Sequence, residues 1–420
     1  MRDRKHVVIV GGGFGGINAA KKLKKADVDI TIIDKTNHHL FQPLLYQVAT
    51  AALSPGDIAV PIRALLGQRK GMKVLLDKVV DVNKTELFVE LEGGRKIPFD
   101  YLVLAPGAHY NYFGHNDWEH YAPGLKSVGD ALQIRERILL SLEKAEQLDD
   151  PKLREPYLTY VIIGGGPTGV EMAGAIAEIA KRNMMRDYST FSKNETRIFL
   201  VEAGPRLLNG YPESLSERAR STLEDMGVSV LLNTAVTNIA QNNVTFSEGT
   251  IETPNIIWAA GVAASPLLNS LDTKQNKTAR VFVNNDLSIP GNPNIFVLGD
   301  AAHKTDKHGN LLPALAPVAI QQGKYIGNLI KDELEGKERK AFHYVDKGTM
   351  ATIGRAKAVA DIRGFKFSGF FAWALWSIVH IFFLIGFHNR FRVFIEWMWQ
   401  YVTFKRDVRL ITDRFKKEEA

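Results

Sequence analysis

Two segments of the sequence share one design, and this duplication limits the possible folds more than any other feature. In each segment a run of β-branched residues leads into a glycine-rich turn and then a helix-like run: VVIVGGGFGGINAAKKLKK spans residues 7–25, and YVIIGGGPTGVEMAGAIAEIAKR spans residues 160–182. Another strand-like run follows each helix, DITIIDK and TRIFLVEAG. This order is typical of β-α-β units, so the sequence predicts an α/β fold with two Rossmann-like dinucleotide-binding domains and parallel sheets.

Further strand-like runs assign most of the remaining chain to these two units. YLVLAPGA follows the first unit, NIIWAAGV follows the second, and NIFVLGDAA leads towards a helix-like run that begins near Pro317. Domains usually hold about 50 to 250 residues, so the chain has room for two or three of them. We expect the second nucleotide domain to be inserted in the first. The expected boundaries are residues 1–110 and 285–340 for the first domain, 111–284 for the second and 341–420 for a distinct C-terminal part.

The first glycine-rich turn carries the features of a dinucleotide site. Gly11 allows a tight turn, Gly13 lets the backbone approach a pyrophosphate, and Gly16 lets the helix pack on the strand. The start of the helix favours phosphate charge. Asp34 ends the second strand, where a carboxylate accepts hydrogen bonds from an adenosine ribose. An isolated glycine-rich turn would be weak evidence, but strand, helix and acid together favour the site. Its candidate residues are Gly11, Gly13, Phe14, Gly15, Gly16 and Asp34.

The second turn has the same context, with Glu202 as the acid that ends its second strand. A carboxylate there accepts a hydrogen bond from the 2′-OH of NADH and repels the 2′-phosphate of NADPH, so the sequence favours NADH. The alternative is a solvated carboxylate at a strand end, since an insertion lengthens the spacing. The candidate residues are Gly164, Gly166, Gly169, Glu202 and Gly261.

Two dinucleotide sites in one chain distinguish a flavin reductase from a simple dehydrogenase. We assign FAD to the first domain and NADH to the second. Asp300 ends a strand, where its carboxylate is placed to bind the ribityl chain of FAD, although an N-cap or an Asx turn would also explain it. The helix from Pro317 would direct its positive end towards the flavin. Gly107 is a further FAD candidate.

The chain contains no cysteine. Disulfide, thiolate-metal and redox-dithiol mechanisms are therefore excluded, and any redox chemistry must come from a bound cofactor. We predict no metal site. The net charge of +7 suits nucleic acid, an anionic membrane or anionic cofactors, and no dense Lys/Arg block decides among them. Because the strand-like run His6–Val10 starts almost at the amino terminus, we expect neither a signal peptide nor a transit peptide, and a chain that starts in the cytoplasm or an equivalent compartment.

The C-terminal part holds an uncharged, aromatic-rich run at residues 367–387, FSGFFAWALWSIVHIFFLIGF. Its length would suffice to span a bilayer. However, Trp373, Trp376, Ser377 and His380 lie along its middle, where a spanning helix seldom carries such residues. A transmembrane helix therefore stays the less favoured alternative.

The next segment is amphipathic. Its apolar residues recur at helical spacing, and basic residues flank them, as in helices that lie in one leaflet and contact anionic headgroups. We therefore expect a membrane-associating helical region and no nucleic-acid partner, with a dimer interface or core packing as alternatives. The apolar residues are Phe391, Phe394, Ile395, Met398 and Val402, and the basic ones are Arg390, Arg392, Lys405, Arg406 and Arg409.

Taken over essentially its whole length, the chain resembles the type II NADH:quinone oxidoreductases, single-subunit enzymes of respiratory membranes that pump no protons. The last two of the four stretches that carry this resemblance are the most specific. These stretches are HHLFQPLLYQVATAALSPGDIAVPIR (38–63), LPALAPVAIQQG (312–323), MATIGRAKAVADI (350–362) and NRFRVFIEWMWQYVTFKRDVRLIT (389–412).

The resemblance implies roles for several residues. Gln42 would line the flavin, and Glu171 would lie beside flavin and nicotinamide, either to relay protons to quinone or only to position the cofactors. Gln321 and Gln322 would border the quinone entrance, unless they are satisfied within their helix or against FAD. Members of the family often have glutamine where this chain has Pro317, so Gln321 is the favoured quinone contact.

The predicted function is hydride transfer from NADH to FAD, followed by two-electron transfer to a membrane quinone without proton pumping. The protein would lie peripherally on the cytoplasmic side of the cell membrane, with a homodimer left open. Sulfide:quinone oxidoreductases are excluded because they need cysteine. A soluble NADH:ferredoxin-type reductase and a membrane-tethered flavin redox sensor stay as alternatives.

Overall fold

The computed structural model describes residues 4–180, 187–403 and 408–411. Contacts divide the chain into two compact units. The first contains residues 1–40, 59–109 and 262–347, and the second contains residues 41–58, 110–261 and 348–420. The expected assignment of FAD, NADH and membrane to particular segments stays a prediction, because compactness does not test which ligand a segment holds.

The core of the first unit is a six-stranded sheet in the order β20-β21-β9-β1-β2-β5. All neighbouring pairs are parallel except β20 with β21. The run Val7–Val10 is buried on both faces, as expected for the central strand of a parallel sheet. The strands are β1 (Lys5–Val10), β2 (Val28–Asp34), β5 (Met72–Leu76), β9 (Tyr101–Leu104), β20 (Ser288–Ile289) and β21 (Asn292–Val297).

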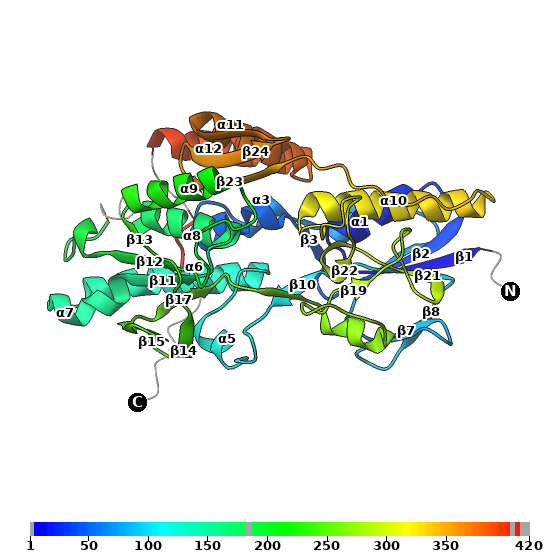
Figure 1. Cartoon of the computed structure of the whole chain (residues 1–420), viewed down its shortest axis with the longest axis horizontal. Coiled ribbons are helices and arrows are strands. Elements are labelled where there is room, and N and C mark those ends of the chain that lie inside the picture. The colour runs from blue at the N-terminus through cyan, green and yellow to red at the C-terminus, as the bar shows by residue number, and fades with distance from the viewer. Residues whose placement is uncertain (1–3, 181–186, 404–407, 412–420) are drawn as a thin grey trace. The chain divides into compact units, whose positions relative to one another are not determined.

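Two helices of the first unit, α1 (Phe14–Leu23) and α10 (Ala316–Leu334), lie side by side (Figure 1). Glycine permits this close approach, since a methyl group at Gly323 would lie 2.2 Å from the carbonyl oxygen of Gly15. The helix expected near Pro317 begins one residue earlier, and the proline occupies its first turn.

Short elements complete the first unit. They are β3 (His38–Leu40) with β4 (Ala59–Pro61), α4 (Ile62–Leu66), the meander of β6 (Val79–Asn83), β7 (Phe88–Leu91) and β8 (Lys96–Pro98), the 3-10 helices η5 (Pro266–Leu271) and η6 (Gly299–Ala301), and β19 (Val281–Phe282) with β22 (Ala302–His303). Two further short strands, β10 (Ala108–Tyr110) and β18 (Val262–Ala264), pair at the points where the chain passes from one unit to the other.

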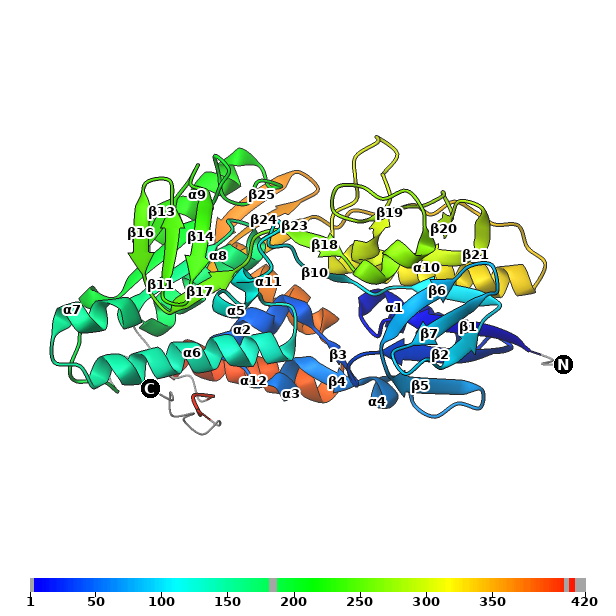
Figure 2. The same cartoon turned by 90° about the horizontal axis from the view of Figure 1, so that it is seen from below.

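The second unit contains a four-stranded parallel sheet in the order β13-β12-β11-β17. Helix α6 (Val128–Glu146) runs along this sheet (Figure 2). The remaining elements are β11 (Thr159–Ile163), β12 (Arg197–Val201), β13 (Val228–Leu231), β17 (Asn255–Trp258), α8 (Pro167–Glu178), α9 (Glu213–Asp225), the meander β14 (Val236–Ala240), β15 (Asn243–Phe246) and β16 (Gly249–Glu252), and the short helices η1 (Gln42–Leu44), α2 (Leu45–Ala49), α3 (Pro55–Ile58), α5 (Trp118–Tyr121), α7 (Pro151–Arg154), η2 (Glu155–Leu158) and η4 (Lys193–Glu195).

The C-terminal part of the second unit is a three-stranded antiparallel sheet followed by two helices. The elements are β23 (Thr349–Gly354), β24 (Lys357–Ile362), β25 (Phe365–Gly369), α11 (Phe370–Phe383) and α12 (Phe387–Thr403). Helix α8 packs tightly on β23, because a methyl group at Gly174 would lie 1.6 Å from the carbonyl oxygen of Ile353.

The aromatic run 367–387 is therefore divided between the end of β25, α11 and the start of α12. Within the described ranges, no helix combines the length and the apolar character that crossing a membrane requires.

Candidate active site

The first glycine loop has the geometry of a dinucleotide turn. Gly11 has a φ of +103°, and a methyl group there would lie 2.1 Å from the carbonyl oxygen of Ala105. A methyl group at Gly16 would lie 1.9 Å from the carbonyl oxygen of Gly11. Asp34 accepts a hydrogen bond from the backbone N–H of Gly12 at 2.5 Å, so the acid lies at the loop. Only glycine fits both crowded positions.

The start of α1 suits a phosphate. Gly13 is the N-cap, and no side chain caps the helix within the part of the chain that the structure describes. A methyl group at Gly13 would meet no neighbouring atom of the described residues within 4 Å. The first N–H groups of a helix need acceptors, and a pyrophosphate supplies them together with charge that the helix dipole stabilises. The loop, with Phe14 and Gly15 in the first turn, therefore fits a pyrophosphate. Its assignment to FAD stays a prediction.

The second glycine loop repeats these features. Gly164 has a φ of +112°, and a methyl group at Gly169 would lie 1.8 Å from the carbonyl oxygen of Gly164. Gly166 caps α8 without a side-chain hydrogen bond and has open space around it among the described residues. The Glu202 carboxylate accepts from the N–H of Gly165 at 2.6 Å and from the N–H of Gly204 at 2.7 Å. Glu202 thus contacts its glycine loop as Asp34 contacts the first loop, and its role at a ribose stays a prediction.

A hydrogen bond to the Gln322 side chain stabilises the turn that carries Asp300. Gln322 is buried, and its Oε1 accepts from the N–H of Gly299 at 2.6 Å. Asp300 lies in the 3-10 helix η6, just past the end of β21. Gly107 has a φ of +71°, and a methyl group there would have open space around it in the part of the chain that the structure describes. These three residues belong to the first unit.

Gln321 is paired with the protein backbone. Its Nε2 donates to the carbonyl oxygen of Val345 at 2.9 Å, and its Oε1 accepts from the N–H of Val345 at 3.0 Å. The nitrogen and the oxygen of the side-chain amide both form hydrogen bonds within the protein. This favours the alternative that Gln321 has a structural role. Its role as a quinone contact stays a prediction. Gln42, half-buried, begins the 3-10 helix η1 in the second unit.

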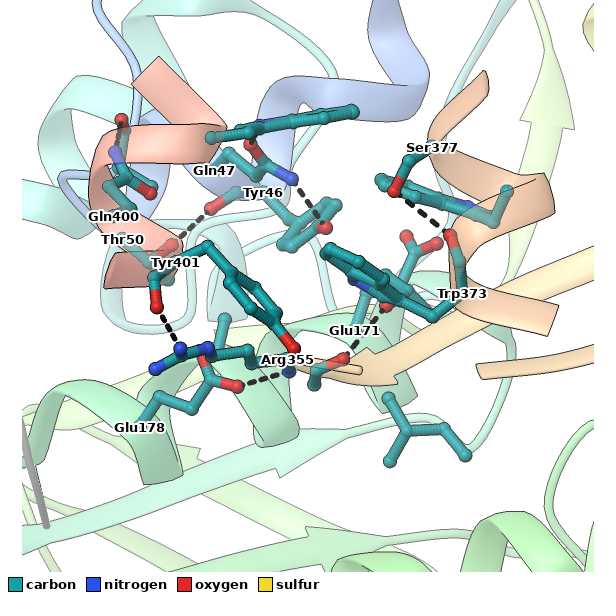
Figure 3. Close-up of a pocket in the computed structure, with 17 residues that line it drawn as sticks. Tyr46, Gln47, Thr50, Glu171, Glu178, Arg355, Trp373, Ser377, Gln400 and Tyr401 are labelled. Atoms are coloured by element: carbon teal, nitrogen blue, oxygen red, sulfur yellow. Dashed lines mark hydrogen bonds between the residues drawn. The ribbon is translucent and has the colours of Figure 1, made fainter. Parts of the chain in front are cut away.

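Glu171 faces a pocket that lies entirely within the second unit (Figure 3). The cavity holds about 110 Å³, and most of its wall is apolar or aromatic. Five segments build it: α2 and the residues after it, α8, β23, α11 and α12. The lining residues are Tyr46, Gln47, Thr50, Ala52, Glu171, Ala175, Glu178, Thr352, Ile353, Gly354, Arg355, Trp373, Trp376, Ser377, Trp397, Gln400 and Tyr401.

Burial favours the protonated form of the Glu171 carboxyl. Burial raises the pKa of this carboxyl to about 8, and the backbone N–H of Thr352, which donates to it, opposes part of the rise. A desolvated carboxyl keeps its proton because the charged form loses hydration. The pocket therefore contains a carboxylic acid that is able to donate a proton.

A chain of hydrogen bonds joins helix α12 to helix α2 across the pocket. The indole Nε1 of Trp397 donates to Oε1 of Gln47 at 2.7 Å, and Nε2 of Gln47 donates to the Tyr46 hydroxyl at 2.8 Å. Gln400 Nε2 donates to the carbonyl oxygen of Ala52 at 2.5 Å. These contacts fix the side chains that face Glu171.

A second set of contacts anchors the end of α12. The Arg355 guanidinium lies over the Tyr401 ring at 4.1 Å and also donates to the Tyr401 carbonyl oxygen. The backbone N–H of Arg355 donates to Glu178 at 2.5 Å. These contacts connect α8, β23 and α12 at the rim of the pocket.

The sequence made Glu171 a candidate beside flavin and nicotinamide, which stays a prediction, and it did not point to most of the other residues that line this pocket. Tyr46, Gln47 and Trp397 lie inside stretches that carry the family resemblance, and this was the only signal available for them. The structure brings them together with Glu171 in one unit, whereas Gln321 lies in the other.

Comparison with known proteins gives two family matches. Residues 5–323 match the pyridine nucleotide-disulphide oxidoreductase family, and residues 347–407 match the NDH2 C-terminal domain. The type II NADH:quinone oxidoreductase Ndh of Mycobacterium tuberculosis is 43% identical to the chain, covering 98% of the chain and 91% of that protein. A type II NADH:quinone oxidoreductase of Haemophilus influenzae is 32% identical, covering 85% of the chain and 87% of that protein.

Solved structures show the same fold. NDH2 from Plasmodium falciparum in complex with NADH matches with a TM-score of 0.87 at 23% identity, covering 96% of the chain and 99% of that structure. The sulfide:quinone oxidoreductase of Aquifex aeolicus matches with a TM-score of 0.71 at 18% identity, covering 93% of the chain and 92% of that structure.

Proposed function

Because the chain belongs to the type II NADH:quinone oxidoreductase family, we propose that it oxidises NADH with FAD as the relay and reduces a membrane quinone without pumping protons. The observation that carries this proposal is similarity along the whole chain to enzymes of that name, the C-terminal part included. Bound FAD supplies the chemistry, since it accepts a hydride and releases electrons singly or in pairs.

The residues of the two loops have distinct roles in this proposal. The first loop, from Gly11 to Gly16, presents the start of α1 to the phosphates of FAD, and Asp34 receives the adenosine ribose. The second loop, from Gly164 to Gly169, does the same for NADH, with Glu202 at its ribose. We further propose that Asp300 binds the FAD ribityl chain.

The pocket around Glu171 is proposed as the quinone site. Its aromatic wall suits an apolar ring, and a quinone needs two protons for each pair of electrons that it accepts. In this proposal the protonated Glu171 carboxyl supplies one such proton, and solvent supplies the other and reprotonates Glu171. Gln47, held by Trp397, orients the Tyr46 hydroxyl on the opposite wall.

Purified protein tests the proposal directly. We expect a bound-flavin spectrum, bleaching of that spectrum by NADH, and NADH oxidation that depends on added benzoquinone or naphthoquinone. Electron transfer to a ferredoxin-type protein acceptor in preference to quinones would instead favour a soluble-acceptor reductase. Slow turnover with both acceptors would favour a redox sensor.

Glu202→Gln is expected to reduce the preference for NADH over NADPH by roughly 10- to 100-fold, because a charge-assisted hydrogen bond to the ribose is lost and the repulsion of the 2′-phosphate disappears. The amide oxygen of glutamine still accepts a hydrogen bond from the N–H of Gly165 or Gly204, so the loop should keep its shape. The ratio of kcat/KM for the two nucleotides measures the effect. An unchanged ratio would place the ribose elsewhere.

We also propose that α11 and α12 bind the surface of a lipid membrane. Large apolar side chains on both helices are exposed, with Phe371 at 80% and Phe387 at 84%, and Figure 1 shows the two helices together in the second unit. Arg390 and Arg392 lie on α12. The Nε of Arg390 donates to the carbonyl oxygen of Leu384 at 2.7 Å, and the Arg392 guanidinium lies 3.9 Å from the Asp57 carboxylate. The Arg392 side chain is 58% exposed, so it is still able to meet anionic headgroups. Of the other basic residues predicted to flank this face, Arg409 forms an ion pair with Asp187, whereas Lys405 and Arg406 lie outside the described residues.

Replacing both Phe371 and Phe387 by serine should weaken binding to vesicles of mixed neutral and anionic lipid at least tenfold, because each phenylalanine buried in lipid contributes about 1.5–3 kcal/mol. Cosedimentation with the vesicles measures this. Leu153→Ser is the matched control, since Leu153 is also exposed but lies on α7. Retained binding by the double variant would contradict the proposal, and a shift from dimer to monomer in the same variant would assign the face to a homodimer.

The cytoplasmic side of the membrane stays part of the proposal, and protease access to inverted vesicles tests it.

A further inference from the structure

Phe113 has a backbone conformation that phenylalanine seldom adopts. Its φ is +54°, in the left-handed region that bulky residues avoid, and its side chain is 64% exposed. An exposed ring gains little from packing, so stability of the fold alone does not account for the conformation. Residues in such sparsely populated conformations concentrate at functional sites.

Local contacts hold Phe113 in this position. Its backbone N–H donates to Oδ1 of Asn111 at 2.8 Å, and the N–H of Asn111 donates to the carbonyl oxygen of Gly261 at 3.4 Å. The centroid of its ring lies 6.2 Å from that of Trp258, which is only 2% exposed and stacks on Tyr112 at 5.0 Å. The exposed ring therefore rests on a buried aromatic base.

The ring of Phe113 also lies at the carboxyl end of strand β17, and a Rossmann domain binds its dinucleotide at the carboxyl ends of its strands. A methyl group at Gly261 would be 2.7 Å from Cζ of Phe113, so the ring lies beside this glycine, which is itself exposed. Gly261 follows β17, which pairs in parallel with β11. The backbone after β17 touches the glycine loop, since a methyl group at Gly164 would lie 2.7 Å from the carbonyl carbon of Ala259. Phe113 and the exposed Gly261 therefore lie close to the buried start of the glycine loop at Gly164, all within the second unit.

The order of the strands indicates which half of the nucleotide this surface meets. Glu202 follows β12 and Gly261 follows β17, and these two strands lie on opposite sides of β11. In a Rossmann domain the pyrophosphate lies at the start of the helix after the central strand, here α8, and the two nucleosides extend to either side. With adenosine at Glu202, nicotinamide riboside extends towards Gly261.

We propose that Phe113 is a substrate-binding residue whose ring packs against the nicotinamide riboside half of the nucleotide. The inference rests on the proposed function, because it takes NADH as the ligand of the second loop. A planar aromatic ring suits this ligand in both redox states, since NADH presents a planar ring to stack on and NAD⁺ adds a cation–π attraction.

The proposal is tested by measuring, with calorimetry, how tightly the oxidised holoenzyme binds AMP, ADP-ribose and NAD⁺, three ligands of increasing length. Phe113→Ala should weaken NAD⁺ about tenfold, while ADP-ribose, which lacks the nicotinamide, should lose less than NAD⁺ and AMP should change less than twofold. Phe113→Leu keeps apolar area but no ring and should fall between. Phe113→Gly removes the ring and also relieves the left-handed backbone, so it should lose NAD⁺ affinity without losing thermal stability.

Two results would overturn the inference. NAD⁺ binding that is unchanged in Phe113→Ala would show that the ring does not touch the nucleotide, and an equal loss for AMP and NAD⁺ would show that Phe113 only shapes the loop. Failure of the wild-type protein to bind NAD⁺, ADP-ribose and AMP would instead contradict the proposed function itself.

Discussion

Glu171→Gln is expected to slow quinone reduction by about 10²- to 10⁴-fold, the range that a positioned proton donor contributes, while flavin reduction by NADH changes only a few-fold. The amide has nearly the shape of the carboxylic acid, so the pocket should keep its form. However, it has no acidic proton to give to a quinone. Stopped-flow measurement of the two half-reactions separates these effects.

The dependence on pH gives an independent test of the same residue. Because burial raises the pKa of Glu171 to about 8, its proton is present below that pH and lost above it. The rate constant for quinone reduction should therefore fall as the pH rises through about 8, and this fall should disappear in Glu171→Gln. Glu178→Gln is the control, since Glu178 lines the same pocket on the same helix but accepts from the N–H of Arg355. If Glu171→Gln slowed only the reduction of flavin by NADH, Glu171 would position the nicotinamide and would not donate a proton to the quinone.

The nucleotide loops could be predicted from the sequence because their signals are local. A glycine with a positive φ, a buried β-branched strand and a helix that starts within a few residues all lie in one short segment. The acids Asp34 and Glu202 were predictable for the same reason, since each ends the next strand. Even the insertion before Glu202 does not disturb this, because the parallel pairing of β11 with β12 returns the acid to the loop.

The pocket could not be read from the sequence in the same way. The hydrogen bond between Trp397 and Gln47 joins residues 350 positions apart, and no local pattern specifies such a pairing. The pairing of Gln321 with Val345 was likewise invisible, because the partner is a backbone group in a segment without regular structure. Polar side chains on a helix show that a partner is needed, but they do not show which one.

The composition of the aromatic run 367–387 fits both a membrane-spanning helix and helices that lie at the membrane surface. Its composition permitted a membrane-spanning helix, but Gly369, with a φ of +78°, stands before α11, and Gly386, with a φ of +93°, stands before α12. Both glycines adopt a conformation that interrupts a continuous helix. The exposed face that results favours a helix pair lying at an interface, which is the basis of the membrane proposal.

Gly13→Asp should reduce FAD affinity by roughly 10³-fold without unfolding the protein. Gly13 has extended backbone angles that any residue adopts, and a side chain there meets no described atom within 4 Å of its Cβ. Aspartate is a favoured N-cap, so α1 itself should gain stability. The new carboxylate would occupy the N–H groups that a phosphate needs and would repel the phosphate by about 4 kcal/mol at a separation of about 4 Å. Flavin absorbance of the purified protein and its thermal unfolding measure the two effects.

Gly166→Asp is the matched variant in the second domain, because Gly166 also has extended backbone angles and open space around it among the described residues. By the same physical reasoning it should keep its flavin absorbance and lose NAD⁺ binding, whereas Gly13→Ala, which adds no charge, should keep both. The opposite pattern, with flavin lost only in Gly166→Asp, would exchange the two cofactor assignments. Flavin lost in both aspartate variants would mean that the charge acts through the fold and not at one loop, and the assignment of one cofactor to each loop would then be wrong.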